Sequence, residues 1–259
     1  MKSLSLKSLP LIGLCALLLF AACGEKDTTE TGNLALNFQL QYDGQPLVMF
    51  DRYEYPNGME FFFTRFNFYL SNLTINQTGG TSSTASISLN EVDFLNLTSD
   101  HESAAGAAEG TTVVFENVAL GLYDNLQFDI GVPAELNGKR PREYPNDHPL
   151  ADTGEYWDSW NSFIFSKTEG KIDTDGDGQA ELGLAYHIGG DETLRNLVLD
   201  KSFSIENGQT TTVTIIIEMK RMFDDGTTVY DPLQTAQIHS LTQLGEANIL
   251  ADNLKAAFR

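Results

Sequence analysis

Cysteine is almost absent from this chain, which limits how an exported domain can be held together. The two cysteines are Cys15 and Cys23. Cys15 lies within an apolar N-terminal segment that we expect to be removed, so the mature chain keeps one thiol and can form no internal disulfide. The domain must therefore be held by its apolar core, or by a core together with a bound metal ion.

Basic side chains are also scarce. The chain carries 16 lysines and arginines against 36 aspartates and glutamates, a formal net charge of -20. Nucleic acids and anionic membrane surfaces present phosphate, and phosphate recognition needs a basic footprint. We therefore expect no nucleic-acid partner. The acid excess is compatible with a bound cation or a cationic partner, although solubility alone also accounts for it.

The sequence lacks the short motifs of the common hydrolases and nucleotide-binding enzymes. It contains no Gly-x-Ser-x-Gly, no His-Glu-x-x-His and no phosphate-binding loop. The mature fold also has no cysteine nucleophile. These absences favour a binding protein, and we expect no enzymatic activity.

The N-terminus has the layout of an export signal. Lys2 and Lys7 precede an apolar run over residues 9–20, which ends in Phe20-Ala21-Ala22-Cys23. This run resembles a bacterial lipobox, and the acidic residues after it resemble the surface-export signal of Bacteroidetes lipoproteins. We expect a signal peptide over 1–22, lipid on Cys23 and a polar tether over 23–32. The expected location is the outer membrane, on its periplasmic or cell-surface face; a plain cleaved signal is the alternative.

Residues 33–259 read as a single all-β domain. Apolar and polar residues alternate over about ten short segments with turn residues between them, which indicates an antiparallel β-sandwich or open barrel. Segments 197–205 and 210–219 flank an Asn-Gly turn, so we expect them to pair as a hairpin. The chain ends in a predicted amphipathic helix whose apolar residues recur every three or four positions. These are Leu244, Ala247, Leu250, Leu254 and Ala257.

The segment from Gly154 to Gly190 reads as two strands joined by an acidic turn. In its second strand, His187 alternates with apolar neighbours and shares its own face with Gly183, Ala185 and Gly189. A histidine on a face of very small residues leaves room either for a ligand or for a closely packed neighbour. The sequence alone leaves both alternatives open.

The turn between these strands has the spacing of a calcium loop. Its acids fall at alternating positions and a glycine follows them at the sixth position, as hard cations require. Leu184 stands at position 12, where such loops usually have a glutamate. We expect Glu181 to supply a carboxylate ligand instead. The calcium candidates are Asp173, Asp175, Asp177 and Glu181. The alternative is an acidic β-turn whose charges are solvated.

Five segments together resemble the MbnP-like copper-binding domain of exported bacterial proteins. They are residues 34–38, 64–72, 123–132, 156–165 and 186–190, in the order found in that family. The resemblance implies an extracytoplasmic β-sandwich. It also implies copper bound by histidines and by a tryptophan oxidised to kynurenine, with a di-haem peroxidase-like enzyme as the partner that makes the kynurenine.

Under this resemblance His187 matches the family's histidine. The remaining copper candidates are His148, which precedes the tryptophans, and His239, which precedes the C-terminal helix. Trp157 and Trp160 complete the set, and Trp160 is the better candidate for oxidation because it begins the matching strand. Structural histidines and core tryptophans are the alternative for all five.

Two functions follow from these observations. The first is a lipid-anchored, extracytoplasmic copper protein in copper acquisition or handling. The second is a non-enzymatic cell-surface binding or adhesion module with a structural calcium loop.

Overall fold

The computed structural model describes residues 30–78 and 86–259, so the predicted signal peptide and Cys23 lie outside the described residues. The strands are β1 (Thr31–Tyr42), β2 (Gln45–Pro46), β3 (Tyr53–Glu54), β4 (Glu60–Gln77), β5 (Ser86–Ser88), β6 (Val92–Asn96), β7 (Thr111–Ala119), β8 (Gly121–Ile130), β9 (Tyr156–Trp157), β10 (Ser162–Ile172), β11 (Leu182–Gly189), β12 (Arg195–Ile205), β13 (Thr210–Glu218) and β14 (Gln237–Ile238). The α-helices are α1 (Ala104–Glu109), α2 (Ala134–Asn137), α3 (Lys220–Phe223) and α4 (Leu244–Ala257). The 3-10 turns are η1 (Ser99–His101), η2 (Pro141–Glu143), η3 (Pro149–Ala151), η4 (Thr153–Glu155), η5 (Asp191–Thr193) and η6 (Leu241–Gln243).

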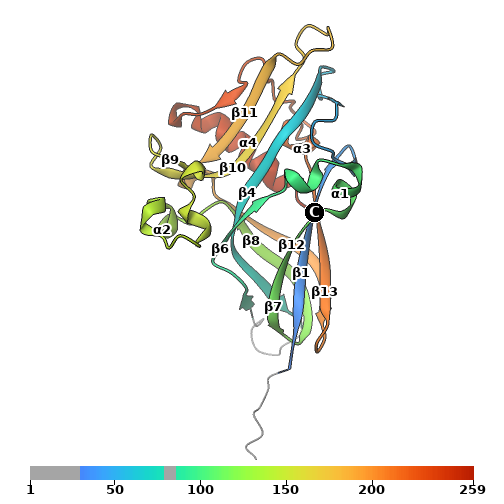
Figure 1. Ribbon diagram of the computed structural model, residues 1–259, viewed down its shortest axis with the longest axis vertical. Coiled ribbons are helices and arrows are strands. Elements are labelled where there is room, and N and C mark those ends of the chain that lie inside the picture. The colour runs from blue at the N-terminus through green and yellow to red at the C-terminus, as the bar shows by residue number, and fades with distance from the viewer. Residues whose placement is uncertain (1–29, 79–85) are drawn as a thin grey trace, which may run out of the picture.

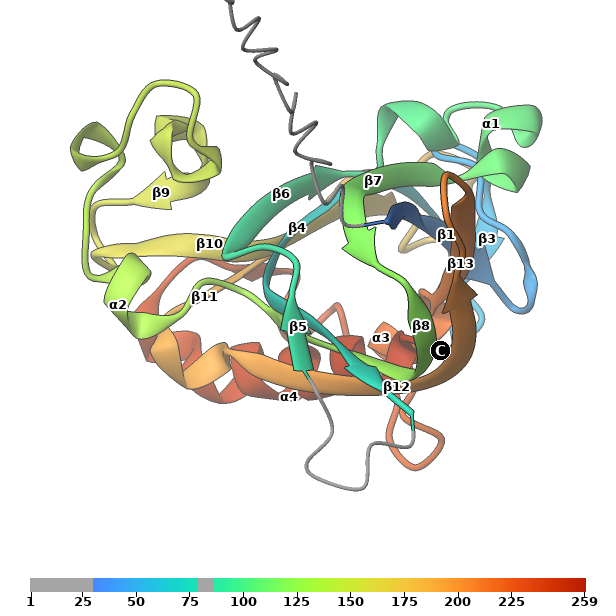
Figure 2. The ribbon, with the colours of Figure 1, turned by 90° about the horizontal axis from the view of Figure 1, so that it is seen from below.

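The strands form two sheets that do not close into a barrel over the described residues. The smaller sheet has the order β13-β1-β2, with β7 also paired to β1. The larger runs β12-β8-β4-β10-β11-β14, with β3, β5 and β6 on β4 and β9 on β10 (Figures 1 and 2). This confirms the predicted mostly-β sandwich. The pairing is not wholly antiparallel, since β1–β13 and β11–β14 are parallel.

The main core lies between the two sheets and is rich in aromatic rings. Phe68 of β4 contacts Phe38 of β1 at 6.0 Å between ring centroids and Phe258 after α4 at 5.5 Å. The segment after β8 folds into α2, η2, η3 and η4. It closes over a second, smaller core that includes Tyr69 and Phe163. Both faces of β4 are therefore buried at its centre.

The prediction that β12 and β13 pair as a hairpin is wrong. β12 pairs with β8 in the larger sheet, whereas β13 pairs with β1 in the smaller sheet. The turn over residues 206–209 takes the chain from one sheet to the other, and Gly208 allows its positive φ of 67°. Strand periodicity predicts each strand but carries no information on which sheet receives it.

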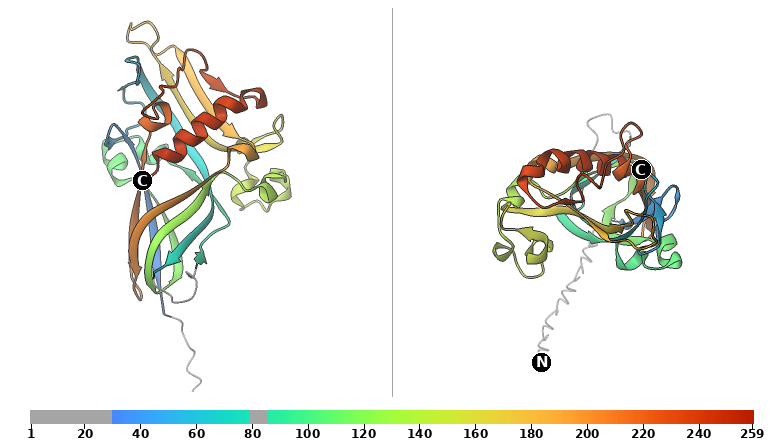
Figure 3. Two further views of the ribbon diagram at one scale, coloured as in Figure 1. Left: turned by 180° about the vertical axis from the view of Figure 1, so that it is seen from behind. Right: turned by 90° about the horizontal axis from the view of Figure 1, so that it is seen from above.

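The predicted C-terminal helix is α4, and it lies across the back of the larger sheet (Figure 3). Its buried face includes Ala247, Leu250, Leu254 and Ala257, as the spacing predicts. Because α3 and α4 cover this face of β10 and β11, side chains on the opposite face are left for other contacts. Within the described residues, no helix has both the length and the apolar character needed to cross a membrane.

His101 ties the loop after β6 to β1. Its side chain is fully buried, Nε2 accepts the N–H of Leu40 at 3.1 Å, and Nδ1–H donates to the carbonyl of Leu97 at 2.8 Å. Burial lowers the pKa of His101, against a smaller opposing effect of the Leu97 hydrogen bond. The histidine is therefore neutral and structural.

We expect His101 to make the protein less stable as the pH falls. Because the pKa is lowered in the folded state, the unfolded chain binds more protons, and stability is lost as the pH drops below about 6.5, the unfolded value. His101→Ala leaves two backbone groups unpaired and should lower the free energy of unfolding by about 2–4 kcal/mol at pH 7. Urea denaturation at pH 5, 6 and 7 measures both effects. His148→Ala is the control, and equal pH profiles for wild type and His101→Ala would contradict the assignment.

Candidate metal centre

The parallel pairing of β11 with β14 places two histidines side by side. Ala185 pairs with Gln237 and Tyr186 with Ile238, so the next residues along, His187 and His239, are neighbours on one face. Their ring centroids lie 4.8 Å apart. His239 is exposed, whereas the His187 side chain is 15% exposed. Two imidazoles from strands far apart in sequence therefore meet at the sheet edge.

Both tryptophans lie against these imidazoles. Trp157 is held by β9, which pairs with the start of β10, and its ring lies 5.5 Å from that of His187 and 5.1 Å from that of His239. Trp160 is buried, lies 4.8 Å from Trp157, and donates its Nε1–H to the His239 carbonyl at 3.2 Å. We call Trp157, Trp160, His187 and His239 the Trp–His cluster. Four of the five predicted copper candidates are in it.

The small residues around His187 serve two purposes. A Cβ on Gly189 would lie 2.6 Å from the Phe163 carbonyl oxygen and 3.3 Å from the Trp160 ring, so only glycine lets Trp160 pack here. A Cβ on Gly183 would meet nothing within 4 Å. The small-residue face is therefore closely packed at the tryptophan end and open at the other.

Glu169 of β10 fixes the orientation of the His187 ring. His187 Nε2 lies 2.8 Å from Glu169 Oε1, and Arg65 lies 3.6 Å from the same carboxylate. The hydrogen bond from His187 lowers the pKa of Glu169, burial opposes this, and the Arg65 charge adds to the lowering. An ionised Glu169 accepts Nε2–H, which leaves the lone pair of a neutral His187 on Nδ1.

Nδ1 of His187 is buried and has no hydrogen-bond partner among the described residues. Buried polar atoms are almost always paired, so this imidazole nitrogen is a candidate ligand atom. A ligating histidine characteristically donates its other N–H to a carboxylate, as His187 does to Glu169. Burial lowers the pKa of His239, the neighbouring His187 acts in the same direction, and Glu169 opposes them. The neutral form of His239, which offers a nitrogen lone pair, is therefore favoured.

The family model for MbnP matches residues 31–240. The chain belongs to the MbnP family. A solved structure described as MbnP from Methylosinus trichosporium has the same fold, with a TM-score of 0.52 at 15% sequence identity. The match covers 78% of this chain and 80% of that one. No curated protein matches the chain.

His148 lies apart from the Trp–His cluster of this MbnP-family chain. Its Nδ1 accepts the N–H of Leu150 at 3.1 Å and so caps η3. Its ring stacks on Tyr144 with centroids 4.5 Å apart. These contacts give His148 a local structural role in the loop over the second core.

Sequence reasoning did not identify Glu169. A signal for it was present, because Lys167, Glu169 and Lys171 alternate along β10, whose other residues are uncharged. The antiparallel register pairs Lys167 with His187 and Glu169 with Ala185, which places these charged side chains on the histidine's face. Aligning the two predicted strands as an antiparallel pair would have placed Glu169 next to His187.

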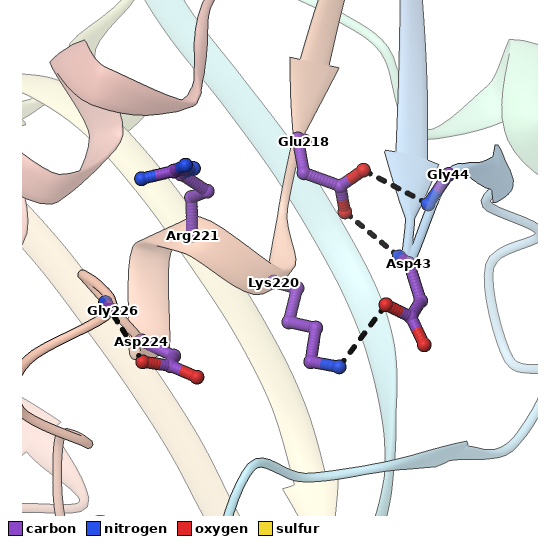
Figure 4. A pocket seen from close by; sticks show the side chains of 7 residues that line it. All are labelled: Asp43, Gly44, Glu218, Lys220, Arg221, Asp224 and Gly226. Carbon is purple, nitrogen blue, oxygen red and sulfur yellow. Dashed lines mark hydrogen bonds and ion pairs between the residues drawn. The ribbon is translucent and has the colours of Figure 1, made fainter.

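A hollow of about 310 Å³ beside β13 and α3 offers less chemistry (Figure 4). Lys220 pairs with Asp43 at 3.1 Å, and the Glu218 carboxylate accepts the N–H groups of Asp43 and Gly44 at 2.8 and 3.0 Å. Lys220, Asp43 and Glu218 therefore already have partners. This hollow is separate from the Trp–His cluster and contains no histidine.

The acidic turn brings three of its four predicted calcium ligands together. One carboxylate oxygen from each of Asp173, Asp175 and Asp177 lies within 4.8 Å of the others. Asp173 is buried, and its oxygens accept the N–H groups of Gly176 and Gly178, each at 2.7 Å. Burial acts to raise the pKa of Asp173, but these backbone hydrogen bonds outweigh it and the pKa is lowered.

Glu181 is directed elsewhere. Its carboxylate accepts the N–H of Thr174 at 2.9 Å and also the Thr174 hydroxyl. Arg52 donates to the Gly178 carbonyl at 2.7 Å and ties the turn to the neighbouring strands. Hydrogen bonds within the turn thus engage the carboxylates of Asp173 and Glu181. Calcium binding here stays a prediction.

We expect calcium, if bound by this turn, to stabilise the protein modestly. Sites of this kind in exported modules have dissociation constants of about 0.1–1 mM, so about 10 mM calcium contributes roughly 1.4–2.7 kcal/mol. The thermal midpoint should rise by about 3–6 °C relative to protein in chelator. Asp175→Asn/Asp177→Asn should abolish the rise, and Asp225→Asn should retain it. Equal thermal midpoints with calcium and with chelator would contradict calcium binding by this turn.

Proposed function

We propose that this chain is a lipid-anchored, extracytoplasmic protein that binds copper at the Trp–His cluster and acts in copper acquisition or handling, without catalysis. The observation that carries the proposal is the unpaired, buried Nδ1 of His187 beside the neutral imidazole of His239. The predicted lipid on Cys23 supports a location at the outer membrane.

The donor set favours copper over other cations. Calcium and magnesium need several oxygen ligands, and no carboxylate belongs to the cluster, since Glu169 is occupied by His187 and Arg65. Zinc sites take four protein ligands, or three and a water, whereas the two imidazoles alone offer fewer. Among divalent first-row ions copper binds nitrogen sites most strongly, and a low coordination number suits Cu(I).

We propose that Trp157, rather than the sequence-preferred Trp160, is the tryptophan that becomes oxidised. Trp157 is partly exposed and contacts both imidazoles, whereas Trp160 is buried with its N–H bonded to the His239 carbonyl. Cleavage of the indole C2–C3 bond by two oxygen atoms, followed by hydrolytic loss of C2 as formate, gives kynurenine. Its aryl amine supplies a third nitrogen beside the histidines. The oxidant comes from the di-haem peroxidase-like partner.

We expect His187→Ala and His239→Ala to weaken copper binding by more than about a hundredfold. Loss of a ligand costs more than loss of a supporting group, which costs about 10–100-fold, so Glu169→Gln should fall in that lower range. Competition with a Cu(I) chelator measures the affinities, with His148→Ala as the matched control. Equal affinity in all variants would contradict the site. Native protein that holds calcium but no copper would favour the surface-binding module instead.

A separate measurement tests the modification. Protein purified from its own host should carry a tryptophan in which one carbon has been exchanged for one oxygen, the net change of kynurenine formation. Peptide mass spectrometry should place this change on Trp157 and leave Trp160 intact, because only Trp157 is partly exposed. The change on Trp160 alone would overturn the assignment of Trp157, and no change on either residue would remove the oxidising partner from the proposal.

A further inference from the structure

A buried ion pair lies beside the Trp–His cluster. Lys167 Nζ is 2.9 Å from Glu155 Oε2 and donates to the Gly154 carbonyl at 2.8 Å. The two side chains are only 7% and 8% exposed. Removing such charges from water costs several kcal/mol for each ion, so this pair is poor evidence for added stability. A role in holding one conformation explains it better.

The pair spans from the sheet to the segment that carries Trp157. Lys167 is directly opposite His187 in the β10–β11 register, so the two side chains emerge on the same face. Gly154 and Glu155 immediately precede β9, which contains Trp157. Trp157 itself pairs with Ser162 of β10. Trp157 is thus anchored on both sides.

We propose that Lys167 and Glu155 form a clamp that positions Trp157 over His187 and His239. This inference rests on the copper-binding function proposed above and assigns the two residues as positioning residues for its site. Lys167 binds the chain before Trp157 at two points, the Gly154 carbonyl and the Glu155 carboxylate. The clamp fixes the indole in place before any metal arrives, so the ligand geometry is preorganised.

The clamp also neutralises the positive charge of Lys167 beside the cluster. An ammonium one strand away from two imidazoles repels a cation, and the effect is strong in a partly desolvated site. The Glu155 carboxylate cancels this charge while it holds the segment. Glu155→Gln should therefore weaken cation binding through both position and charge. Lys167→Met loses the position but leaves the Glu155 carboxylate unpaired, a charge that favours a cation, so the double variant without either charge isolates the effect of position.

The decisive test reads the position of Trp157 without metal. In a Trp160→Phe background Trp157 is the sole tryptophan, and acrylamide quenching of its fluorescence reports its exposure. We expect Lys167→Met to increase the quenching constant at least about twofold and to weaken Cu(I) binding by about tenfold, the range typical of groups that orient ligands. Lys171→Met is the matched control, because Lys171 is exposed and alternates with Lys167 on the same strand face. It should change neither value.

A lone buried charge can prevent folding, so a second variant protects the test. Glu155→Leu/Lys167→Met removes both charges together and should fold, yet it still lacks the bond to the Gly154 carbonyl. Unchanged quenching in a folded variant would overturn the clamp, even if the wild type binds copper. Raised quenching with no copper bound to the wild type would uphold the clamp and contradict the copper function. The two ideas therefore fail separately.

Discussion

The hydrogen-bond register of β10, β11 and β14 is the constraint on which the site depends. That register places Lys167, His187 and His239 in one row and sets Glu169 diagonally beside His187. Side chains alternate with a period of two, so a slip by one residue would turn His187 into the core and Tyr186 out of it. Tyr186 is fully buried on the opposite face, which is covered by α3 and α4. Apolar packing on one face therefore fixes the polar geometry on the other.

Although the chain is rich in acidic residues, Glu155 and Glu169 beside the Trp–His cluster are both paired. Glu169 is occupied by His187 and Arg65, and Glu155 is neutralised by Lys167. Both of these carboxylates are thus committed to other side chains. The donor atom left unpaired at the cluster is a nitrogen rather than an oxygen, which supports the copper site proposed above. Net charge alone, which is compatible with any cation, could not have made that distinction.

Local patterns predicted the elements well, and non-local pairing accounts for what they missed. Alternation identified the β11 faces and the setting of His187, and the three-to-four spacing identified α4. The two-residue strand β14 has no periodic signal, so nothing in the sequence placed His239 beside His187. The contacts of Trp157 and Trp160 depend on the turn between β9 and β10, where the Trp160 ring packs on Gly189, and local patterns carry no information on that packing. The β12–β13 error has the same origin, because sheet membership is decided by distant partners.

The β10–β11 hairpin also keeps two kinds of donor apart. The aspartates lie in its turn, while the imidazoles lie toward the other end of β11. The row of His187 is five residue steps from the last pair of the ladder, Leu182 with Ile172, a distance of about 17 Å at the usual rise of a strand. Oxygen donors suit hard cations and imidazoles suit copper. The length of the ladder keeps the aspartates away from the histidines, and this separation is compatible with the copper site proposed above and the calcium site predicted in the turn.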